Sequence, residues 1–263
     1  MSSKSPATEL KVTMVQTELV WQQANANCEQ ISKRLENLQD TDLIVLPEMF
    51  NSGFTLDATK VAETMDGETV QWMIAEAKKQ NAAITGSIVV SEKGEHFNRM
   101  LFAMPDGTVE YYDKRHLFRM ANEQQRYAAG ETRKTITWRG WRIALYVCYD
   151  LRFPIWCRDQ NDTDLMLFVA SWPAVRSYPW QTLLKARAME NLCYVCGVNR
   201  IGTDDNNIDY SGDSAVIDMK GQETSYLGND DRIETTALDG QALAKFRDKF
   251  PAWMDSDQFQ IST

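Results

Sequence analysis

The chain has 263 residues, of which 43% are hydrophobic and 25% are charged, and its formal net charge is −9. This length suits one large α/β domain, or two small ones, with a core big enough to need no disulfides. The acidic balance excludes the basic footprint that a nucleic-acid or anionic-membrane surface would need. No apolar run approaches the ~20 residues that span a bilayer.

The N-terminal residues and the cysteine pattern together predict the cellular compartment of the protein. Residues 1–7 (Met-Ser-Ser-Lys-Ser-Pro-Ala) lack the apolar stretch of a signal peptide. The five cysteines are an odd number and show no framework spacing. Reduced thiols in the cytoplasm are therefore expected.

The first half of the chain alternates strands and helices. Residues 10–15 and 42–46 read as strands, and apolar residues at steps of three and four predict helices over about 24–38 and 69–80. The first helix places Cys28 on its core face. Three consecutive strands are expected at 83–90, 97–104 and 108–112, the last two joined by the turn Pro-Asp-Gly at 105–107.

The second half repeats this alternation after a polar loop at 119–133. Strands are expected at 134–138, 141–147, 164–170, 192–198, 214–218 and 233–238, and helices at 180–191 and 241–250. Cys193 and Cys196 match the C-x-x-C pattern, but they lie within an apolar strand and are expected to be core residues. With no linker or internal repeat, we predict a single domain over 1–263 with a layered α/β sandwich.

Three of the predicted buried strands end in ionisable residues: Glu48, Lys114 and Cys148. Strand ends are where sites collect in α/β proteins. Each residue alone has a structural explanation, but together they offer a nucleophilic thiol, a base and a fixed cation. The thiol needs a base because its free pKa is ~8.5. The chain has only two histidines, His96 and His116, and His116 remains an alternative base.

Three ordered motifs resemble those of the nitrilase, or carbon–nitrogen hydrolase, superfamily. They are Leu-Pro-Glu-Met-Phe with Gly-Phe at 46–54, Tyr-Asp-Lys-Arg-His-Leu-Phe at 112–118, and Val-Cys-Tyr-Asp-Leu-Arg-Phe-Pro at 147–154. Residues 170–173 and 186–191 agree as well, and residues 250–255 look like the tail of the omega-amidase branch. The resemblance covers nearly the whole chain from Leu10 onward.

This resemblance implies a Glu48–Lys114–Cys148 triad in an αββα sandwich, which usually dimerises so that two sandwiches stack. Cys148 would attack a carboxamide carbonyl while Glu48 shuttles protons. Lys114 and the backbone N–H of Tyr149 would hold the oxyanion. A second glutamate, Glu123, would orient Lys114. The tail, about 250–263, is expected at the interface of a homodimer, and family members need no metal or organic cofactor.

The substrate is less closely specified. Omega-amidases release ammonia from 2-oxoglutaramate or 2-oxosuccinamate, and both substrates carry a remote carboxylate. A guanidinium binds a carboxylate through two oxygens, so Arg176 is the predicted carboxylate ligand, with Phe118 and Trp172 as pocket walls. Two alternatives stay open. One is another nitrilase-type hydrolase (aliphatic amidase, carbamoylase or nitrilase), and the other is a non-catalytic scaffold that uses Cys148 as a redox sensor.

Overall fold

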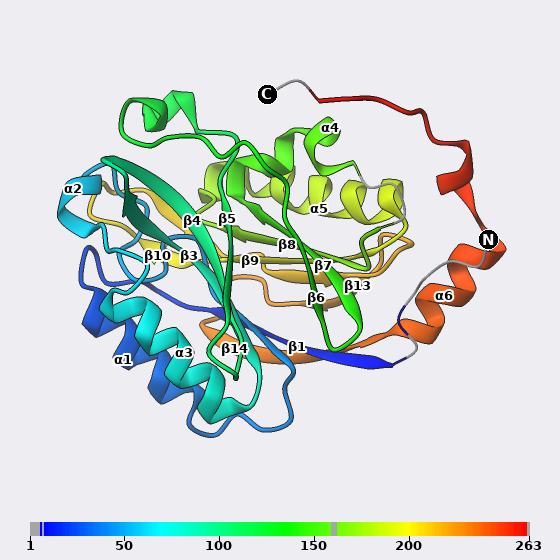
Figure 1. Cartoon of the computed structure of the whole chain (residues 1–263), viewed down its shortest axis with the longest axis horizontal. Helices are drawn as coiled ribbons and strands as arrows, with labels where there is room; N and C mark the ends of the chain where they lie inside the picture. The colour runs from blue at the N-terminus through cyan, green and yellow to red at the C-terminus, as the bar shows by residue number, and fades with distance from the viewer. Residues whose placement is uncertain (1–5, 7, 159–161, 262–263) are drawn as a thin grey trace.

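Two six-stranded β-sheets pack face to face in the computed structural model, and helices cover their outer faces (Figure 1). The structure describes residues 6, 8–158 and 162–261. Most of the stretch used to exclude a signal peptide, and the last two residues of the tail, therefore lie outside the described residues. The layers confirm the predicted αββα sandwich.

The first sheet has the strand order β14-β1-β2-β3-β4-β5, in which β1, β2 and β3 are parallel and the remaining pairs are antiparallel. Helices α1 and α3 cover its outer face (Figure 1). The elements of this half are β1 Glu9–Gln16, α1 Ala24–Leu35, β2 Leu43–Val45, α2 Ala58–Val61, α3 Glu68–Gln80, β3 Ala83–Glu92, β4 Glu95–Ala103, β5 Val109–Asp113 and β14 Arg232–Asp239.

The second sheet has the matching order β13-β12-β9-β8-β7-β6, with β7, β8 and β9 parallel. Helices α4 and α5 lie on its outer face (Figure 1). Its elements are β6 Thr135–Trp138, β7 Trp141–Val147, α4 Pro154–Cys157, β8 Leu165–Ala170, α5 Ser177–Asn191, β9 Tyr194–Asn199, β12 Ala215–Ile217 and β13 Glu223–Tyr226. A small hairpin, β10 Ile201–Thr203 with β11 Asp209–Ser211, and helix α6 Gly240–Lys249 complete the fold.

The main core lies between the sheets, where alternate residues of β1 such as Val12 and Met14 meet β7, β8 and β9. A second cluster lies between the first sheet and helices α1 and α3. Cys28 belongs to this second cluster, and Cys193 and Cys196 belong to the main core, as their positions in the sequence predicted. The apolar periodicity of the chain thus accounts for both cores.

Several boundaries differ from the predicted ones. Helix α1 ends at Leu35, because the chain turns there and Leu38 donates its backbone N–H to the Leu35 carbonyl (3.1 Å) while its side chain still packs on the core. The strand predicted from 192 begins at Tyr194, since Leu192 is the left-handed cap of α5 (φ 49°). The hairpin β10–β11 and the edge strand β13 were not predicted.

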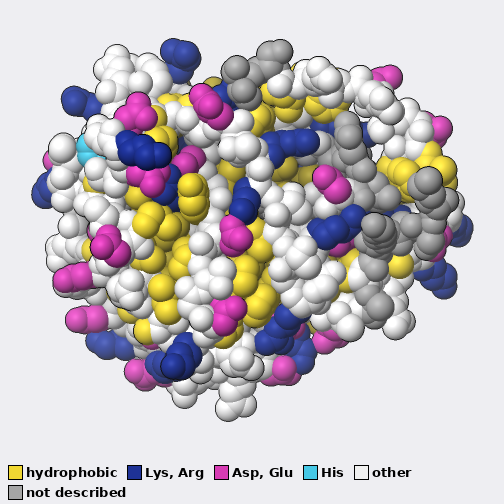
Figure 2. Space-filling model, viewed as in Figure 1, with side chains coloured by type: hydrophobic (Ala, Val, Ile, Leu, Met, Phe, Trp, Pro, Cys, Tyr) yellow, Lys and Arg dark blue, Asp and Glu magenta, His cyan; other side chains and the backbone are white. Residues whose placement is uncertain are grey.

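The surface mixes charges of both signs. Figure 2 shows basic and acidic side chains interspersed over one face, with hydrophobic side chains between them. In the C-terminal tail, Phe250 is 55% exposed and Met254 is 61% exposed. Within the described residues no helix is both long and apolar enough to cross a bilayer.

Candidate active site

Glu48 lies just past the end of β2 and is completely buried. Its Oε1 accepts hydrogen bonds from Lys114 Nζ and Asn98 Nδ2, both at 2.8 Å, and its Oε2 accepts from the backbone N–H of Ser171 at 2.8 Å. The next residue, Met49, has a left-handed backbone (φ 45°), which an L-residue adopts only when its surroundings require it. The Glu48 carboxylate is therefore held in one orientation.

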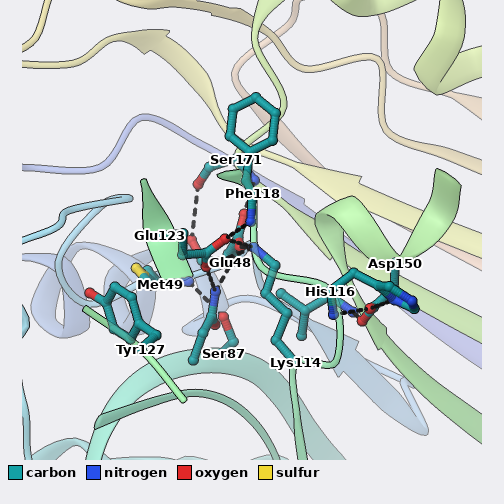
Figure 3. A network of polar contacts seen from close by, with 12 residues as sticks. Glu48, Met49, Ser87, Lys114, His116, Phe118, Glu123, Tyr127, Asp150 and Ser171 are labelled. Carbon is teal, nitrogen blue, oxygen red and sulfur yellow. Dashed lines mark hydrogen bonds and ion pairs between the residues drawn. The ribbon is translucent and has the colours of Figure 1, made fainter. Parts of the chain in front are cut away.

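Lys114 follows β5 and bridges two buried carboxylates (Figure 3). Its Nζ donates to Glu48 Oε1 and lies 2.9 and 3.0 Å from the two oxygens of Glu123. Burial lowers the pKa of the Lys114 ammonium, but Glu123, Glu48 and Cys148 together outweigh that cost and hold it well above its ordinary value. Lys114 is therefore a fixed cation.

Glu123 is fully buried rather than an exposed loop carboxylate. Besides Lys114, it accepts a 2.6 Å hydrogen bond from the backbone N–H of Phe118. Burial, then the nearby Glu48 charge, raises its pKa, although Lys114 opposes the shift. Its segment closes back on Lys114 at Gly130, whose N–H donates to the Lys114 carbonyl (2.9 Å) and where a Cβ would lie 2.1 Å from the Asp113 carbonyl oxygen.

Cys148 lies where β7 turns into a 3-10 helix, Cys148–Arg152. Its φ of 45° is left-handed, so the chain bends sharply at the thiol. Tyr149, whose backbone N–H was predicted to bind an oxyanion, is the next residue of this turn and lines the same cavity as the thiol. Burial, together with the Glu48 carboxylate, raises the pKa of Cys148 well above its ordinary value, while Lys114 lowers it. The resting thiol is therefore protonated near neutral pH.

His116 is directed away from this cluster (Figure 3). Its Nδ1 is 2.7 Å from Asp150 Oδ1, and its ring stacks on Phe153 at 3.7 Å between centroids. The other histidine, His96, lies in β4 and likewise is not among the residues lining the cavity. The structure thus gives the thiol Glu48 as a neighbouring base and does not place either histidine there.

A cavity of about 80 Å³ opens above the thiol. The three predicted substrate-binding residues, Phe118, Trp172 and Arg176, all line it. The Arg176 guanidinium lies 5.4 Å above the Phe118 ring, and the Trp172 Nε1–H donates to the Arg176 carbonyl at 2.7 Å. So small a cavity fits a compact substrate.

Several cavity and network residues were not predicted. Arg152 lines the cavity with its guanidinium 5.0 Å above the Trp172 ring. Asn98 fixes the Glu48 carboxylate. Arg152 lies within the third motif and Asn98 is a polar residue in an apolar strand. Each of these features is a weak sequence signal for a site residue. The remaining unpredicted wall residues are Phe54, Ala121, Ser171, Pro173, Ile208 and Tyr210.

Among the described residues, neither Arg152 nor Arg176 has an acidic partner within ion-pair distance, so this cavity holds two guanidiniums that can bind an anion. No cluster of three or more potential metal ligands occurs in the described part of the chain. The chemistry on offer is therefore a thiol, a buried carboxylate base, a fixed cation and an anion-binding wall.

A thiol, a carboxylate and an ammonium thus meet at strand ends of an αββα sandwich, an arrangement suited to hydrolysis through a cysteine nucleophile, and comparison with known proteins gives a family of hydrolases. Residues 11–248 match the Carbon-nitrogen hydrolase family. The chain belongs to this family.

The chain is 48% identical over 256 residues to the omega-amidase YafV of Escherichia coli K12, covering 96% of this chain and 98% of that one. It is 32% identical over 219 residues to a 2-oxoglutaramate amidase of Bacillus subtilis, covering 81% and 84%. The crystal structure of XC1258 from Xanthomonas campestris, a CN-hydrolase superfamily protein with an arsenic adduct in its active site, superposes with a TM-score of 0.95 at 47% identity, covering 97% and 100%.

Proposed function

We propose that this enzyme releases ammonia from the omega-amide of a 2-oxo dicarboxylic acid, such as 2-oxoglutaramate or 2-oxosuccinamate. The observation that carries the proposal is one small cavity lined by Cys148, Lys114 and two arginines, with the buried Glu48 carboxylate paired to Lys114. Relatives that cover most of the chain carry the names omega-amidase and 2-oxoglutaramate amidase. A small amide with a remote carboxylate fits this combination of groups.

In the first half-reaction Glu48 is the general base. It takes the Cys148 proton as the sulfur attacks the amide carbon, because burial keeps the resting thiol protonated. Lys114 and the Tyr149 N–H stabilise the tetrahedral oxyanion, and one such donor is typically worth about 3 kcal/mol. The intermediate collapses as Glu48 returns the proton to the departing nitrogen, leaving ammonia and a thioester.

In the second half-reaction water hydrolyses the thioester. Glu48 takes one proton from water as its oxygen attacks the thioester carbon, and Lys114 again faces the oxyanion. Collapse breaks the carbon–sulfur bond, releases the carboxylic acid, and returns the Glu48 proton to Cys148. Glu123 holds Lys114 in place through both of its oxygens and keeps the cation available in both steps.

The two guanidiniums set the substrate class. Arg176 and Arg152 lie over the aromatic rings of Phe118 and Trp172, which limits the orientations that their planar forks can take. A carboxylate bound by such a fork is fixed in direction as well as in place. The proposal therefore requires a substrate that carries its carboxylate away from the scissile amide.

The test is ammonia release by the purified protein from 2-oxoglutaramate, beside glutamine, a simple aliphatic amide and a nitrile. Strong preference for the keto-acid amide, lost in Cys148→Ala, supports the proposal. The matched control is Cys28→Ala, which removes a thiol from the helix-side core and leaves turnover intact. Equal turnover of the aliphatic amide would instead favour an aliphatic amidase, and intact hydrolysis in Cys148→Ala would refute the cysteine mechanism.

We further propose a single carbon–nitrogen hydrolase domain that forms a cytoplasmic homodimer. The support for a dimer is the exposure of large apolar side chains on α5 and the C-terminal tail, including Tyr178, Met189, Phe250 and Met254. Light scattering of the intact chain beside a chain ending at residue 249 tests the role of the tail. A monomer in both cases would refute the dimer.

A further inference from the structure

Asp150 is a fully buried carboxylate two residues after the nucleophile, and the proposed reaction does not use it. Its Oδ2 accepts hydrogen bonds from the backbone N–H of Val147 (3.0 Å) and from the Tyr112 hydroxyl (2.8 Å). Its Oδ1 accepts from the backbone N–H of His116 (3.0 Å) and lies 2.7 Å from the His116 ring nitrogen Nδ1. One side chain thus makes four polar contacts with three residues.

These partners flank the two catalytic strand ends. Val147 ends β7 of the second sheet, immediately before Cys148. In the first sheet Tyr112 lies in β5, two residues before Lys114, and His116 follows the strand, two residues after Lys114. The Tyr112 hydroxyl is itself fixed, because it accepts from Trp156 Nε1 (3.0 Å) and from the Arg115 backbone N–H (3.2 Å). Figure 3 shows Asp150 meeting His116 beside the Lys114 strand end.

We propose that Asp150 is a positioning residue that sets the nucleophile turn against the Lys114 strand end. This inference rests on the proposed function. Asp150 does not line the cavity, so it acts through Cys148 and Lys114 rather than on the substrate. The left-handed turn at Cys148 needs such support, since an L-residue relaxes out of that backbone conformation unless its neighbours hold it.

The geometry requires a carboxylate, and a side chain of the same shape does not suffice. Each oxygen accepts one backbone N–H, from Val147 on one side and from His116 on the other. In Asp150→Asn one position becomes an NH₂ group, which faces a backbone donor in either orientation of the amide. The substitution therefore breaks one connection between the strand ends while leaving the volume of the side chain unchanged.

The first readout is the split between kcat and KM for Asp150→Asn. A misplacement of about 1 Å at a catalytic group costs about 10²-fold, so we expect kcat to fall about 100-fold while KM changes less than about threefold. Arg176, the carboxylate ligand that lies in a separate segment, is untouched, which is why KM changes less than kcat. An unchanged kcat in folded protein, or a loss confined to KM, would overturn the proposal.

A second readout needs no substrate, so it separates this proposal from the proposed function. Iodoacetamide alkylation of Cys148, followed by peptide mass spectrometry, should slow in Asp150→Asn, because the thiol moves away from the Lys114 ammonium, which lowers its pKa. If the wild-type protein turns over no amide, and alkylation is still slower in Asp150→Asn than in the wild type, only the proposed function is refuted. Alkylation at the wild-type rate in folded Asp150→Asn would overturn the positioning role.

Two further variants serve as controls for a general loss of stability in Asp150→Asn. Asp239→Ala removes a helix cap remote from the strand ends and should leave kcat and alkylation unchanged. Where Asp150→Asn does not fold, Tyr112→Phe decides, because it keeps the Asp150 carboxylate and removes the phenol hydroxyl with its contacts to Asp150, Trp156 and the Arg115 N–H. A fall in kcat of about threefold or more with unchanged KM supports the proposal, and wild-type kcat overturns it.

Discussion

Removing the charge of Glu48 and removing the charge of Lys114 should shift the pKa of the Cys148 thiol in opposite directions. Both substitutions should nevertheless cause a steep loss of turnover. Burial raises that pKa well above its ordinary value, the Glu48 carboxylate raises it further, and the Lys114 ammonium lowers it. In Glu48→Gln a negative charge disappears, so the thiol pKa should fall. In Lys114→Met the positive charge disappears, so the thiol pKa should rise.

Turnover should fall steeply in both variants. Glu123 should not replace Glu48 as the base, since the Cys148 thiol interacts with Glu48 through a hydrogen bond but with Glu123 only through its charge. We therefore expect kcat to fall about 10³-fold in Glu48→Gln, or about 4 kcal/mol of barrier. Lys114→Met loses an oxyanion partner and should cost about 10²–10³-fold. It also leaves two carboxylates buried without a cation, so stability should fall by about 3–5 kcal/mol.

The assay is the pH dependence of Cys148 alkylation by iodoacetamide, measured on protein shown to be folded by circular dichroism at each pH. Alkylation should begin at lower pH than in the wild type for Glu48→Gln, and at higher pH for Lys114→Met. An unchanged onset in both variants would mean that burial alone sets the thiol pKa. A higher onset in Glu48→Gln would refute the assignment of Glu48 as the neighbouring base.

Three further predictions concern binding, stability and reactivity. Arg176→Ala and Arg152→Ala should each raise KM for keto-acid amides about 10–100-fold, as expected for a hydrogen bond to a charged group worth about 1.5–3 kcal/mol, and an unchanged KM would refute the carboxylate site. Asp239→Ala, which loses the cap of α6, should cost about 1 kcal/mol and lower Tm by about 2–4 °C in calorimetry. Cys28 packs in the helix-side core, where burial raises its pKa to about 12, whereas Cys148 lines the substrate cavity beside Lys114. Mass spectrometry after brief alkylation at pH 7.5 should therefore find Cys148 modified and Cys28 intact.

The elements that carry the site were predictable because their signals are local. A strand buried on both faces reads as a short apolar run, and the run before Cys148 is such a strand in the second sheet. The same holds for the strand before Glu48. The motif at 112–118 located Lys114, and the loop after it carries Glu123, although the sequence alone could not say that this carboxylate is buried.

The unpredicted residues depend on contacts between distant segments. Asn98 meets Glu48 across 50 positions of sequence, and no local pattern distinguishes it from any other polar residue in a strand. The hairpin that brings Tyr210 to the cavity reads as a polar loop, since its turn holds Asp-Asp-Asn-Asn at 204–207. It forms because Asp204 accepts from the Ile208 N–H (3.0 Å) and from the Tyr210 hydroxyl (2.9 Å).

The site is shared between the two sheets, which makes its geometry a property of their packing. Glu48 and Lys114 follow strands of the first sheet, whereas Cys148 and Ser171 follow strands of the second. Ser171 bonds to Glu48 twice, through its N–H to the carboxylate and through its hydroxyl to the Glu48 carbonyl (3.2 Å), and Asp150 joins the sheets again on the other side of Cys148. Because buried polar groups such as these tolerate little displacement, a shift of one sheet against the other would disrupt the base, the cation and the nucleophile together.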